Sequence, residues 1–591
     1  MTTDIFNQYE SEKELLFKEQ QALQRLTTLF SWLRLACFLT LLIFIYLFST
    51  AATPAYLIIA LLMGFALMFL IVYHQKLFNR LEMTTAMLNL VENELNVLHR
   101  KPSFFDDGIA YSSRLPFADD LDLFGKYSLF HFLNRCSTVY GKELLADSLL
   151  TKVPDNQHII CVQEAIKEIA GFEDFRKQVM ARLLVVDRRK GLSHLSIDAK
   201  KLILLFKHPF FGLIRFILPT IVFTTLVYAI LTDQYTFFML AGSVSMILAF
   251  FQSKKMLLLH NEISGHKDAL EVYAQVLMKF GALHVRSAML SEMQELANRA
   301  SQQFRRLSVL SEWFDRRNNM LLFALGNIFF QFDVNLAVEY EKWKKLHYGV
   351  LPDWLAAVGR IEMLISFGVF HANHPSFVFP ELSAMPEIQA VELGHPLISP
   401  EQLVTNDIHL KIDPRIQLVT GSNMSGKSTY LRTLGVNVIL AQAGAPVCAR
   451  EFRWKPCLVL SSLRQSDSLH ENTSLFLNEL KQLQWILLEI QLVDLSLVLL
   501  DEVLRGTNSD DKYTGTHKLL QKLMDFQCLA VVATHDLKLS EMEKEFEGRF
   551  VNFCFESRLT GGKLYFDYTI KKGVAVNRNA TWLMQDMGII G

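Results

Sequence analysis

The sequence has few cysteines, and none of them lies at the spacing of a metal-binding or redox motif. The seven are scattered, odd in number and without a C-x-x-C pair: Cys37, Cys136, Cys161, Cys448, Cys457, Cys528 and Cys554. This pattern argues against a disulfide framework or a zinc site. It favours reduced thiols that face the cytoplasm.

The chain also lacks an excess of charge of either sign. It has 59 lysines and arginines against 60 aspartates and glutamates. This balance gives no overall sign of nucleic-acid binding, although it is compatible with a local basic patch. At 591 residues the chain is too long for one hydrophobic core, and roughly two to four domains are expected.

Charge is absent altogether from two long apolar regions. No charged residue occurs from Leu35 to Tyr73, where only the turn-like run Ser49–Pro54 interrupts the apolar pattern. Phe216–Thr232 and Gln234–Ser253 are also uncharged and are separated by Asp233. Each piece is close to the length of a helix that crosses a bilayer. We therefore expect two transmembrane hairpins, in residues 31–75 and 211–254. The alternative is two helical hairpins buried in a soluble core.

Positive charge flanks these hairpins and is missing from their tips. The flanking residues are Lys18, Arg25, Arg34, Lys76, Arg80, Arg100, Arg215, Lys254 and Lys255. The positive-inside rule therefore places both termini and the segment between the hairpins in the cytoplasm. About thirty polar, helix-like residues precede the first apolar run, which is unlike a signal peptide. We expect an integral, multi-pass protein of the inner or plasma membrane.

The most specific motif is a phosphate-binding loop in the C-terminal third. The pattern G-x-x-x-x-G-K-[ST] is matched by Gly421, Ser422, Asn423, Met424, Ser425, Gly426, Lys427, Ser428 and Thr429. A β-rich run precedes the loop and a helical pattern follows it, as an anion site at a helix N-terminus requires. In such a site Lys427 contacts the β- and γ-phosphates and Ser428 is a ligand of Mg²⁺. We expect ATP and Mg²⁺ to bind here; the alternative is a surface loop with a spare lysine.

Two further segments supply the groups that ATP hydrolysis needs. The apolar run Leu495–Leu500 is typical of a buried parallel strand and ends in Asp501-Glu502. Asp501 is expected to hold the Mg²⁺ shell, and Glu502 to polarise the attacking water as a general base. A second buried-strand pattern leads to His535, at the edge of the sheet where ligands bind. We expect His535 to sense the γ-phosphate. A lone histidine is more often structural.

The residues around these motifs resemble the MutS family of mismatch-recognition ATPases. The similarity lies in the loop T-G-S-N-M-S-G-K-S-T, in D-E-V-L-R-G-T-N at 501–508, in A-T-H at 533–535 and in E-L-G-H-P at 392–396. Ser474-Leu-Phe-Leu-Asn-Glu479 resembles the signature loop of the family, with Leu475 in place of the usual threonine. By this resemblance Ser474 acts in trans at the ATP site of a partner subunit. A homodimer through the ATPase domain is implied.

The resemblance also implies the domain organisation. It covers roughly residues 100–205 and 258–591, and predicts an α/β P-loop ATPase domain of the ABC/MutS type that follows an all-α core and lever domain. With the four expected transmembrane helices, the segments are an N-terminal helix (1–30), hairpin 1 (31–75), a core-like helical segment (76–210), hairpin 2 (211–254), lever helices (255–380) and the ATPase domain (381–591).

The sequence departs from this family where DNA would be read. No N-terminal mismatch-reading domain is visible, and Phe17-Lys-Glu19 matches the F-x-E mismatch wedge only by coincidence, in a pre-membrane helix. Leu403 stands where relatives often have an aromatic residue that stacks on adenine. Basic clusters that could bind phosphates are Arg188–Lys190, Arg305-Arg306, Arg316-Arg317 and Lys342 with Lys344-Lys345. Isolated basic pairs on helices are more often solvated or ion-paired.

Three functions are therefore compatible with the sequence. The first is a membrane-anchored MutS-like ATPase that binds mismatched or branched DNA in repair or recombination. The second is an ABC-type transporter or membrane-remodelling motor without DNA binding, against which the absence of an L-S-G-G-Q signature argues. The third is a scaffold that binds ATP without turnover, against which the presence of Glu502 and His535 argues.

Overall fold

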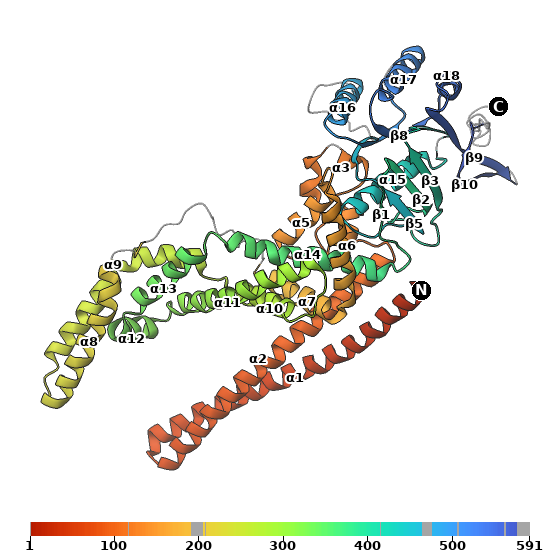
Figure 1. The fold of residues 1–591 in the computed structure, drawn as a ribbon. Coiled ribbons are helices and arrows are strands. Elements are labelled where there is room, and N and C mark those ends of the chain that lie inside the picture. Colours follow the sequence, from red (N-terminus) through yellow and green to blue (C-terminus); the bar gives the residue numbers. More distant parts are fainter. Residues whose placement is uncertain are drawn as a thin grey trace.

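The computed structural model describes residues 2–115, 117–190, 205–206, 209–413, 415–422, 424–463, 475–504, 508–560 and 563–575. Figure 1 shows a long N-terminal helical hairpin, a helical body with an arm that carries a second hairpin at its end, and a C-terminal α/β domain on the opposite side. The helices that precede the α/β domain are α1 Thr2–Ala51, α2 Pro54–Leu98, η1 Ile109–Arg114, α3 Phe117–Asp120, α4 Leu129–Leu133, α5 Val139–Leu150, α6 Asn156–Gly171, α7 Glu173–Lys190, α8 Pro209–Thr232, α9 Thr236–Ile263, α10 Lys267–Gly281, α11 Ala288–Arg316, α12 Met320–Phe330, α13 Phe332–His347 and α14 Leu351–Asn373.

The first hairpin consists of two unusually long helices. α1 contains no proline, and α2 begins at Pro54, where a missing N–H costs nothing because the first helical N–H groups have no intrahelical partner. Ala52, in the left-handed conformation, makes the reversal between them. The domain boundaries expected near residues 30 and 75 lie inside these continuous helices. The apolar segments are thus rigid extensions of helices that reach the body.

Among the described residues, five helices are long and apolar enough to cross a membrane: α1, α2, α8, α9 and α14. The first four contain the expected spans, and their apolar side chains are mostly exposed. α14 differs, because most of its residues are buried where it packs on α5 and α6. It is the central helix of the body.

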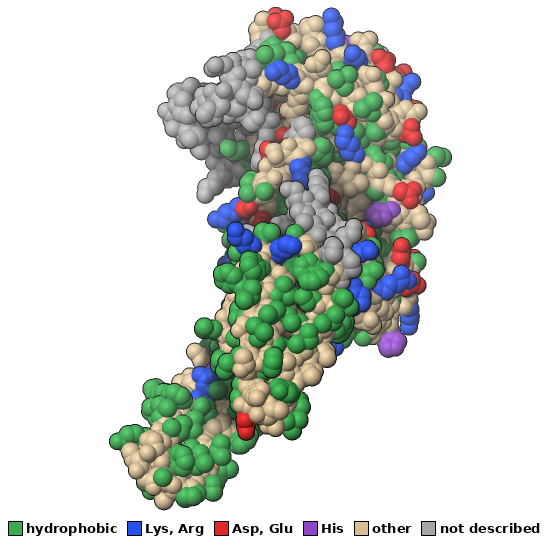
Figure 2. Space-filling model, turned by 90° about the vertical axis from the view of Figure 1, so that its left-hand side faces the viewer, with side chains coloured by type: hydrophobic (Ala, Val, Ile, Leu, Met, Phe, Trp, Pro, Cys, Tyr) green, Lys and Arg blue, Asp and Glu red, His purple; other side chains and the backbone are tan. Residues whose placement is uncertain are grey.

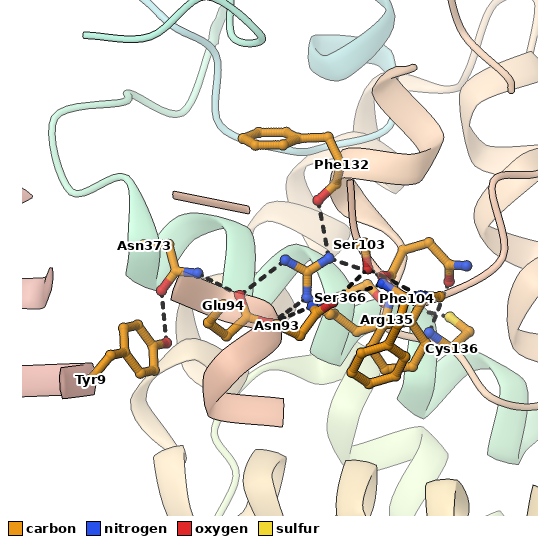
Figure 3. Close-up of polar contacts among 12 residues, drawn as sticks. Tyr9, Asn93, Glu94, Ser103, Phe104, Phe132, Arg135, Cys136, Ser366 and Asn373 are labelled. Atoms are coloured by element: carbon orange, nitrogen blue, oxygen red, sulfur yellow. Dashed lines mark hydrogen bonds and ion pairs between the residues drawn. The ribbon is translucent and has the colours of Figure 1, made fainter. Parts of the chain in front are cut away.

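A buried polar network connects α1 and α2 to the body (Figure 3). Arg135 donates hydrogen bonds to both carboxylate oxygens of Glu94 on α2, at 2.5 and 2.9 Å. Asn373, on α14, donates to the same carboxylate at 2.8 Å and accepts a hydrogen bond from the Tyr9 hydroxyl of α1, also at 2.8 Å. The network therefore joins the base of the first hairpin to the helix that leads into the α/β domain.

The α/β domain contains two sheets and the helices that cover them. The six-stranded sheet has the order β10-β9-β4-β8-β7-β6, in which β10 is antiparallel to its neighbour and the others are parallel. The smaller sheet has the order β1-β5-β2-β3. The strands are β1 Glu381–Leu382, β2 Glu387–Leu393, β3 Asn406–Lys411, β4 Ile416–Thr420, β5 Glu451–Trp454, β6 Leu458–Ser462, β7 Ser496–Asp501, β8 Cys528–Thr534, β9 Phe550–Thr560 and β10 Lys563–Lys572; the helices are α15 Lys427–Gln442, α16 Leu475–Ile490, α17 Ser509–Leu523, η3 Leu537–Glu541 and α18 Met542–Glu545.

Both faces of the large sheet are buried, which explains its continuous apolar strands. Along β7, Leu497 and Leu499 join the main core shared with α15 and the helical body, whereas Val498 and Leu500 join a second core beneath α16 and α17. Successive side chains of a strand point to opposite faces, so burial on both faces requires an apolar residue at every position. The parallel-strand expectation for this segment is confirmed.

The helical body and the α/β domain meet at α3. The loop after α3 packs on α15 so closely that a Cβ atom at Gly435 would lie 2.6 Å from Leu121 Cδ2. Beside this contact the buried Asp120 carboxylate accepts hydrogen bonds from Ser461 Oγ at 2.7 Å, Leu463 N at 3.1 Å and Gln482 Nε2 at 3.3 Å. One carboxylate oxygen of Asp120, in the helical body, thus accepts hydrogen bonds from both β6 and α16.

We expect Asp120→Ala to lower the free energy of unfolding by about 3 kcal/mol, because it leaves buried donors without their charged acceptor. Thermal unfolding of the detergent-solubilised chain would measure this loss. The matched control is Asp119→Ala, since Asp119 is the exposed neighbour, and exposed substitutions usually change stability by less than about 0.5 kcal/mol. Equal effects of the two variants would contradict the role of Asp120 at this junction.

Candidate nucleotide-binding and hydrolysis site

The expected phosphate-binding loop lies between the buried strand β4 and the N-terminus of α15. Gly426 precedes α15 with φ of 105°, a conformation that side chains other than glycine rarely adopt. The Lys427 ammonium is buried and donates to the carbonyl oxygens of Gly421 at 2.7 Å and Ser422 at 3.0 Å. The lysine therefore lies inside the curve of the loop, where backbone N–H groups and positive charge favour an anion.

Ser428 and Asp501 meet next to this loop. The Ser428 hydroxyl, in the first turn of α15, donates to Asp501 Oδ2 at 2.5 Å. Asp501 is the last residue of β7 and is buried. A hydroxyl and a carboxylate at this position are the two protein ligands that a Mg²⁺ ion uses when it also binds nucleotide phosphates.

Glu502 and His535 form a second contact at the same edge. His535 Nδ1 lies 3.1 Å from Glu502 Oε1. The two residues follow neighbouring parallel strands, in which Asp501 is in register with Ala533. Glu502 has φ of 53°, and its N–H donates to the Ala533 carbonyl at 2.9 Å. This backbone conformation, uncommon for a residue other than glycine, turns the carboxylate out of the strand and toward the loop.

A pocket of about 960 Å³ opens over the loop. One wall consists of Met424 to Tyr430 and Glu502, and the opposite wall comes from β2, β3 and the β9–β10 ribbon. The pocket is lined by Leu393, His395, Ile398, Gln402, Val404, Asn406, Ile408, Met424, Ser425, Gly426, Lys427, Ser428, Thr429, Tyr430, Thr433, Glu502, Phe555, Tyr565, Phe566, Asp567 and Tyr568. An aromatic and aliphatic wall opposite a phosphate loop is what a nucleotide base and ribose require.

Several of these residues have no predicted role in the sequence. Tyr568 reaches the pocket because β10 bulges between Phe566 and Ile570, and Asn406 holds the bulge by donating to the Tyr568 carbonyl at 3.1 Å and accepting from Ile570 N at 2.8 Å. Burial lowers the pKa of His395 to about 4, so this histidine is neutral and its Nδ1 accepts the Leu397 N–H at 3.3 Å. A bulge in one strand leaves no local sequence signal, so the sequence alone does not predict that Tyr568 lines the pocket.

The loop contains polar atoms suited to a bound triphosphate. Within the described residues, Ser422 Oγ and Ser425 Oγ are buried and have no hydrogen-bond partner. Buried hydroxyls without partners cost free energy. A phosphate group in the loop would accept from both, so the residues present fit ATP with Mg²⁺.

The structure places some of the other predicted site residues at the pocket and does not describe the rest. Gly421, Ser422, Ser425, Gly426 and Thr429 form or flank the loop, and the Met424 side chain is exposed at the mouth of the pocket. Asn423 and Ser474 lie outside the described residues. Leu403, which stands where relatives often have an aromatic residue that stacks on adenine, packs against Gly394. Its neighbour Val404 lines the pocket instead. Glu479 Oε1 accepts the Leu504 N–H at 2.5 Å, which connects α16 to the loop after Glu502.

Four side chains of the basic clusters form ion pairs, as expected of isolated basic pairs on helices. Arg306 pairs with Glu339 at 2.9 Å, Arg316 with Glu312 at 2.6 Å, Arg317 with Asp333 at 2.9 Å and Lys344 with Glu262 at 2.6 Å. The side chains of Arg188–Lys190 lie outside the described residues. The ion-paired alternative is therefore confirmed for these four side chains.

Comparison with known proteins finds a family match over the residues that form this site. The family MutS domain V matches residues 417–581. The DNA mismatch repair protein MSH3 of Phaeosphaeria nodorum is 31% identical over 238 residues, which are 39% of this chain and 21% of that protein. MutS protein homolog 4 of Homo sapiens is 30% identical over 235 residues, covering 38% and 24%. The DNA mismatch repair protein MutS of Thermotoga maritima is 33% identical over 237 residues, covering 39% and 29%.

These matches are confined to part of each protein: the chain spans less than a third of the length of the three relatives. They coincide with the region that contains the phosphate loop, the Asp501-Glu502 strand end and His535. The family MutS domain V thus accounts for residues 417–581, and this part of the chain is similar to MutS proteins.

Proposed function

We propose that this chain is a membrane-anchored, MutS-type ATPase that binds ATP with Mg²⁺ and hydrolyses it in a dimer. The observation that carries the proposal is the convergence of two pairs at the ends of parallel strands: Ser428 with Asp501 at 2.5 Å, and Glu502 with His535 at 3.1 Å. These groups surround the loop of Lys427, which fits a triphosphate. No single one of them would suffice.

Each residue has a defined part in the proposed reaction. Lys427 neutralises negative charge on the phosphates, and Ser428 and Asp501 would hold a Mg²⁺ ion, which would supply charge stabilisation to the phosphates. Glu502 accepts a proton from the attacking water, so that the oxygen attacks the γ-phosphorus as the bond to the ADP oxygen breaks. His535 holds the Glu502 carboxylate through Nδ1 and orients it toward that water.

We expect Lys427→Ala to abolish ATP binding at nucleotide concentrations that saturate the wild-type chain. The reason is that the substitution removes the buried ammonium group of the loop. Equilibrium binding of a fluorescent ATP analogue to the chain in nanodiscs would measure the loss. Lys455→Ala is a suitable control, since this lysine follows β5 on the smaller sheet. Undiminished affinity in Lys427→Ala would contradict the site.

The proposed dimer can be tested without knowing its structure. If Ser474 acts in trans, Lys427→Ala and Ser474→Ala chains are each inactive, but a mixed dimer contains one site with both residues intact. Random mixing of subunits should then restore about a quarter of the wild-type rate. If Ser474 acts within its own chain, every site in the mixture lacks one residue, and no activity returns.

The membrane setting is supported by the exposed apolar surface of the two hairpins. On α1 and α2, Leu39, Ile43, Leu61 and Phe65 are among many exposed large apolar side chains, and α8 and α9 show the same pattern. Exposed apolar surface on this scale is costly in water. We propose insertion in the inner or plasma membrane with both termini and the ATPase domain in the cytoplasm. Recovery of the full chain in carbonate-washed membranes supports this, and recovery in the soluble fraction contradicts it.

DNA is a further proposed partner. Its support comes from the relatives, two of which are described as DNA mismatch repair proteins. ATPase rates and mobility shifts with duplex, mismatched and branched DNA test it. The alternative is a membrane-remodelling motor without DNA binding, which the ion-paired basic clusters and the exposed hairpins favour. Rates unchanged by all three DNA forms, without a mobility shift, would favour that alternative.

A further inference from the structure

Helix α12 has an exposed surface of apolar side chains. Its eleven residues, MLLFALGNIFF, contain one polar side chain, Asn327, and this side chain is buried. The side chains of Met320, Leu321, Leu325 and Phe330 are 85%, 73%, 54% and 61% exposed. A helix at the surface of a soluble domain normally has a polar outer face. The exposed side of α12 is apolar throughout.

The position of α12 explains this composition. Its C-terminal end packs on the second hairpin: Phe329 lies 5.6 Å from Phe223 of α8 and 6.2 Å from Phe238 of α9, between ring centroids. A Cβ atom at Gly242 of α9 would lie 3.7 Å from Ile328 Cγ2. The apolar surface of α12 is thus continuous with that of α8 and α9, as Figure 2 shows for the face at the end of the arm.

The position of Gly242 along the second hairpin gives the depth of this contact in a bilayer. Gly242 is nine residues beyond Asp233 at the hairpin tip, which corresponds to about 14 Å along a helix. The hydrocarbon core of a bilayer is about 30 Å thick. If the hairpin crosses the bilayer, Ile328 and Phe329 therefore lie near its middle.

The chain turns sharply between α12 and α13, and side chains at this turn form hydrogen bonds with the backbone. α13 departs from α12 at 84°. Asn327 Oδ1 accepts the Asp333 N–H at 3.0 Å, and Gln331 Nε2 and Asn335 Nδ2 donate to the carbonyls of Asn327 and Phe330 at 2.9 and 2.7 Å. Non-helical backbone at membrane depth is stable only when its polar groups are bonded within the protein. The hydrogen bonds of Asn327, Gln331 and Asn335 contribute to that condition at this turn.

Charged and aromatic residues gather where α11, α12 and α13 meet. Arg317 donates to both oxygens of the buried Asp333 carboxylate at 3.0 Å, and its guanidinium lies 5.3 Å from the Phe323 ring centroid. Arg316 lies over the ring of Trp313 at 5.2 Å. In Figure 2, Lys and Arg side chains gather above the apolar surface.

We propose that α12 is a re-entrant membrane helix, which enters the cytoplasmic leaflet at Asn319, reaches the middle of the bilayer at Phe330 and is covered there by lipid acyl chains. The inference rests on the proposed membrane setting of the second hairpin and adds a third inserted element. It means that the bilayer holds the α11–α13 arm directly at its far end.

The test uses single cysteines labelled with an environment-sensitive nitrobenzoxadiazole probe in the full-length chain, reconstituted in phosphatidylcholine and phosphatidylglycerol vesicles. The background carries Cys37→Ser and Cys161→Ser, because these two native thiols are half-buried and the other five are less accessible. Labelled sites are Met320→Cys and Phe330→Cys on α12, Leu240→Cys on α9 as the hairpin reference and Gln302→Cys on the exposed side of α11 as the aqueous reference.

Lipids with a nitroxide near the middle of the acyl chain should quench the probe at Phe330→Cys as strongly as at Leu240→Cys, and the probe at Met320→Cys less strongly. The probe at Gln302→Cys should be unaffected by these lipids and quenched by iodide. Iodide quenching at Phe330→Cys together with lipid quenching at Leu240→Cys overturns the inference and leaves the membrane setting intact. Resistance of Phe330→Cys to both quenchers means that protein covers α12, which also overturns it. Loss of lipid quenching at Leu240→Cys overturns the membrane setting itself.

Discussion

Replacing Glu502 with glutamine is expected to lower kcat for ATP hydrolysis by about 10²–10⁴-fold, the range of a general base. Glutamine keeps the size of the side chain but cannot accept the proton of the attacking water. The phosphate loop, Lys427 and the Ser428–Asp501 pair are unchanged, so ATP should still bind. The variant should therefore accumulate in an ATP-bound state.

Two measurements distinguish a lost base from a damaged site. Single-turnover hydrolysis reports the chemical step, and equilibrium binding of radiolabelled ATP reports the loop. Glu541→Gln is the control, since this exposed glutamate lies after His535 in the same domain; it should hydrolyse ATP at the wild-type rate. Hydrolysis by Glu502→Gln at the wild-type rate would remove Glu502 from the reaction, and loss of binding would show instead that it supports the loop.

Replacing Arg135 with methionine is expected to lower the free energy of unfolding by about 3–5 kcal/mol, because it leaves the Glu94 carboxylate buried without its cation. The side chains of Arg135 and Glu94 are only 3% and 5% exposed. Asn373 donates one hydrogen bond to this carboxylate but supplies no positive charge. The loss should separate the base of the first hairpin from the body.

Denaturant-induced unfolding in detergent micelles would measure the effect. Arg114→Met removes an arginine from an exposed pair, with side chains 40% and 59% exposed, and should cost less than about 1 kcal/mol. The double variant Arg135→Met, Glu94→Leu removes both charges and should recover much of the stability. If Arg135→Met costs no more than Arg114→Met, the network in Figure 3 does not stabilise the body.

The parts of the site that follow strands were predictable because their signals are local. A glycine loop after an apolar run, and two acids after another, each need only a few neighbouring residues to be recognised. The structure then brings Ser428 to Asp501, 73 positions apart, by placing β4 and β7 on either side of β8. Tyr568 had no such signal, because its position depends on a bulge in β10 that Asn406 stabilises from another sheet.

The sequence distinguishes a membrane span from a core helix only where length separates the two alternatives. α14 is as apolar as a span by composition, and its burial against α5 and α6 shows that it belongs to the core. α12 is too short to cross a bilayer, and the sequence predicts it only as part of the lever helices. Its contacts with Phe223, Phe238 and Gly242 relate it to the second hairpin.

By itself the sequence determined the phosphate loop, the acid pair Asp501-Glu502 and the four long apolar helical segments, since each is a continuous pattern whose physical meaning does not depend on distant residues. The tertiary structure decided which apolar helix is core and which is surface, which side chains close the nucleotide pocket, and how the hairpins connect to the body. These features depend on which elements become neighbours, and that is set by packing over the whole chain.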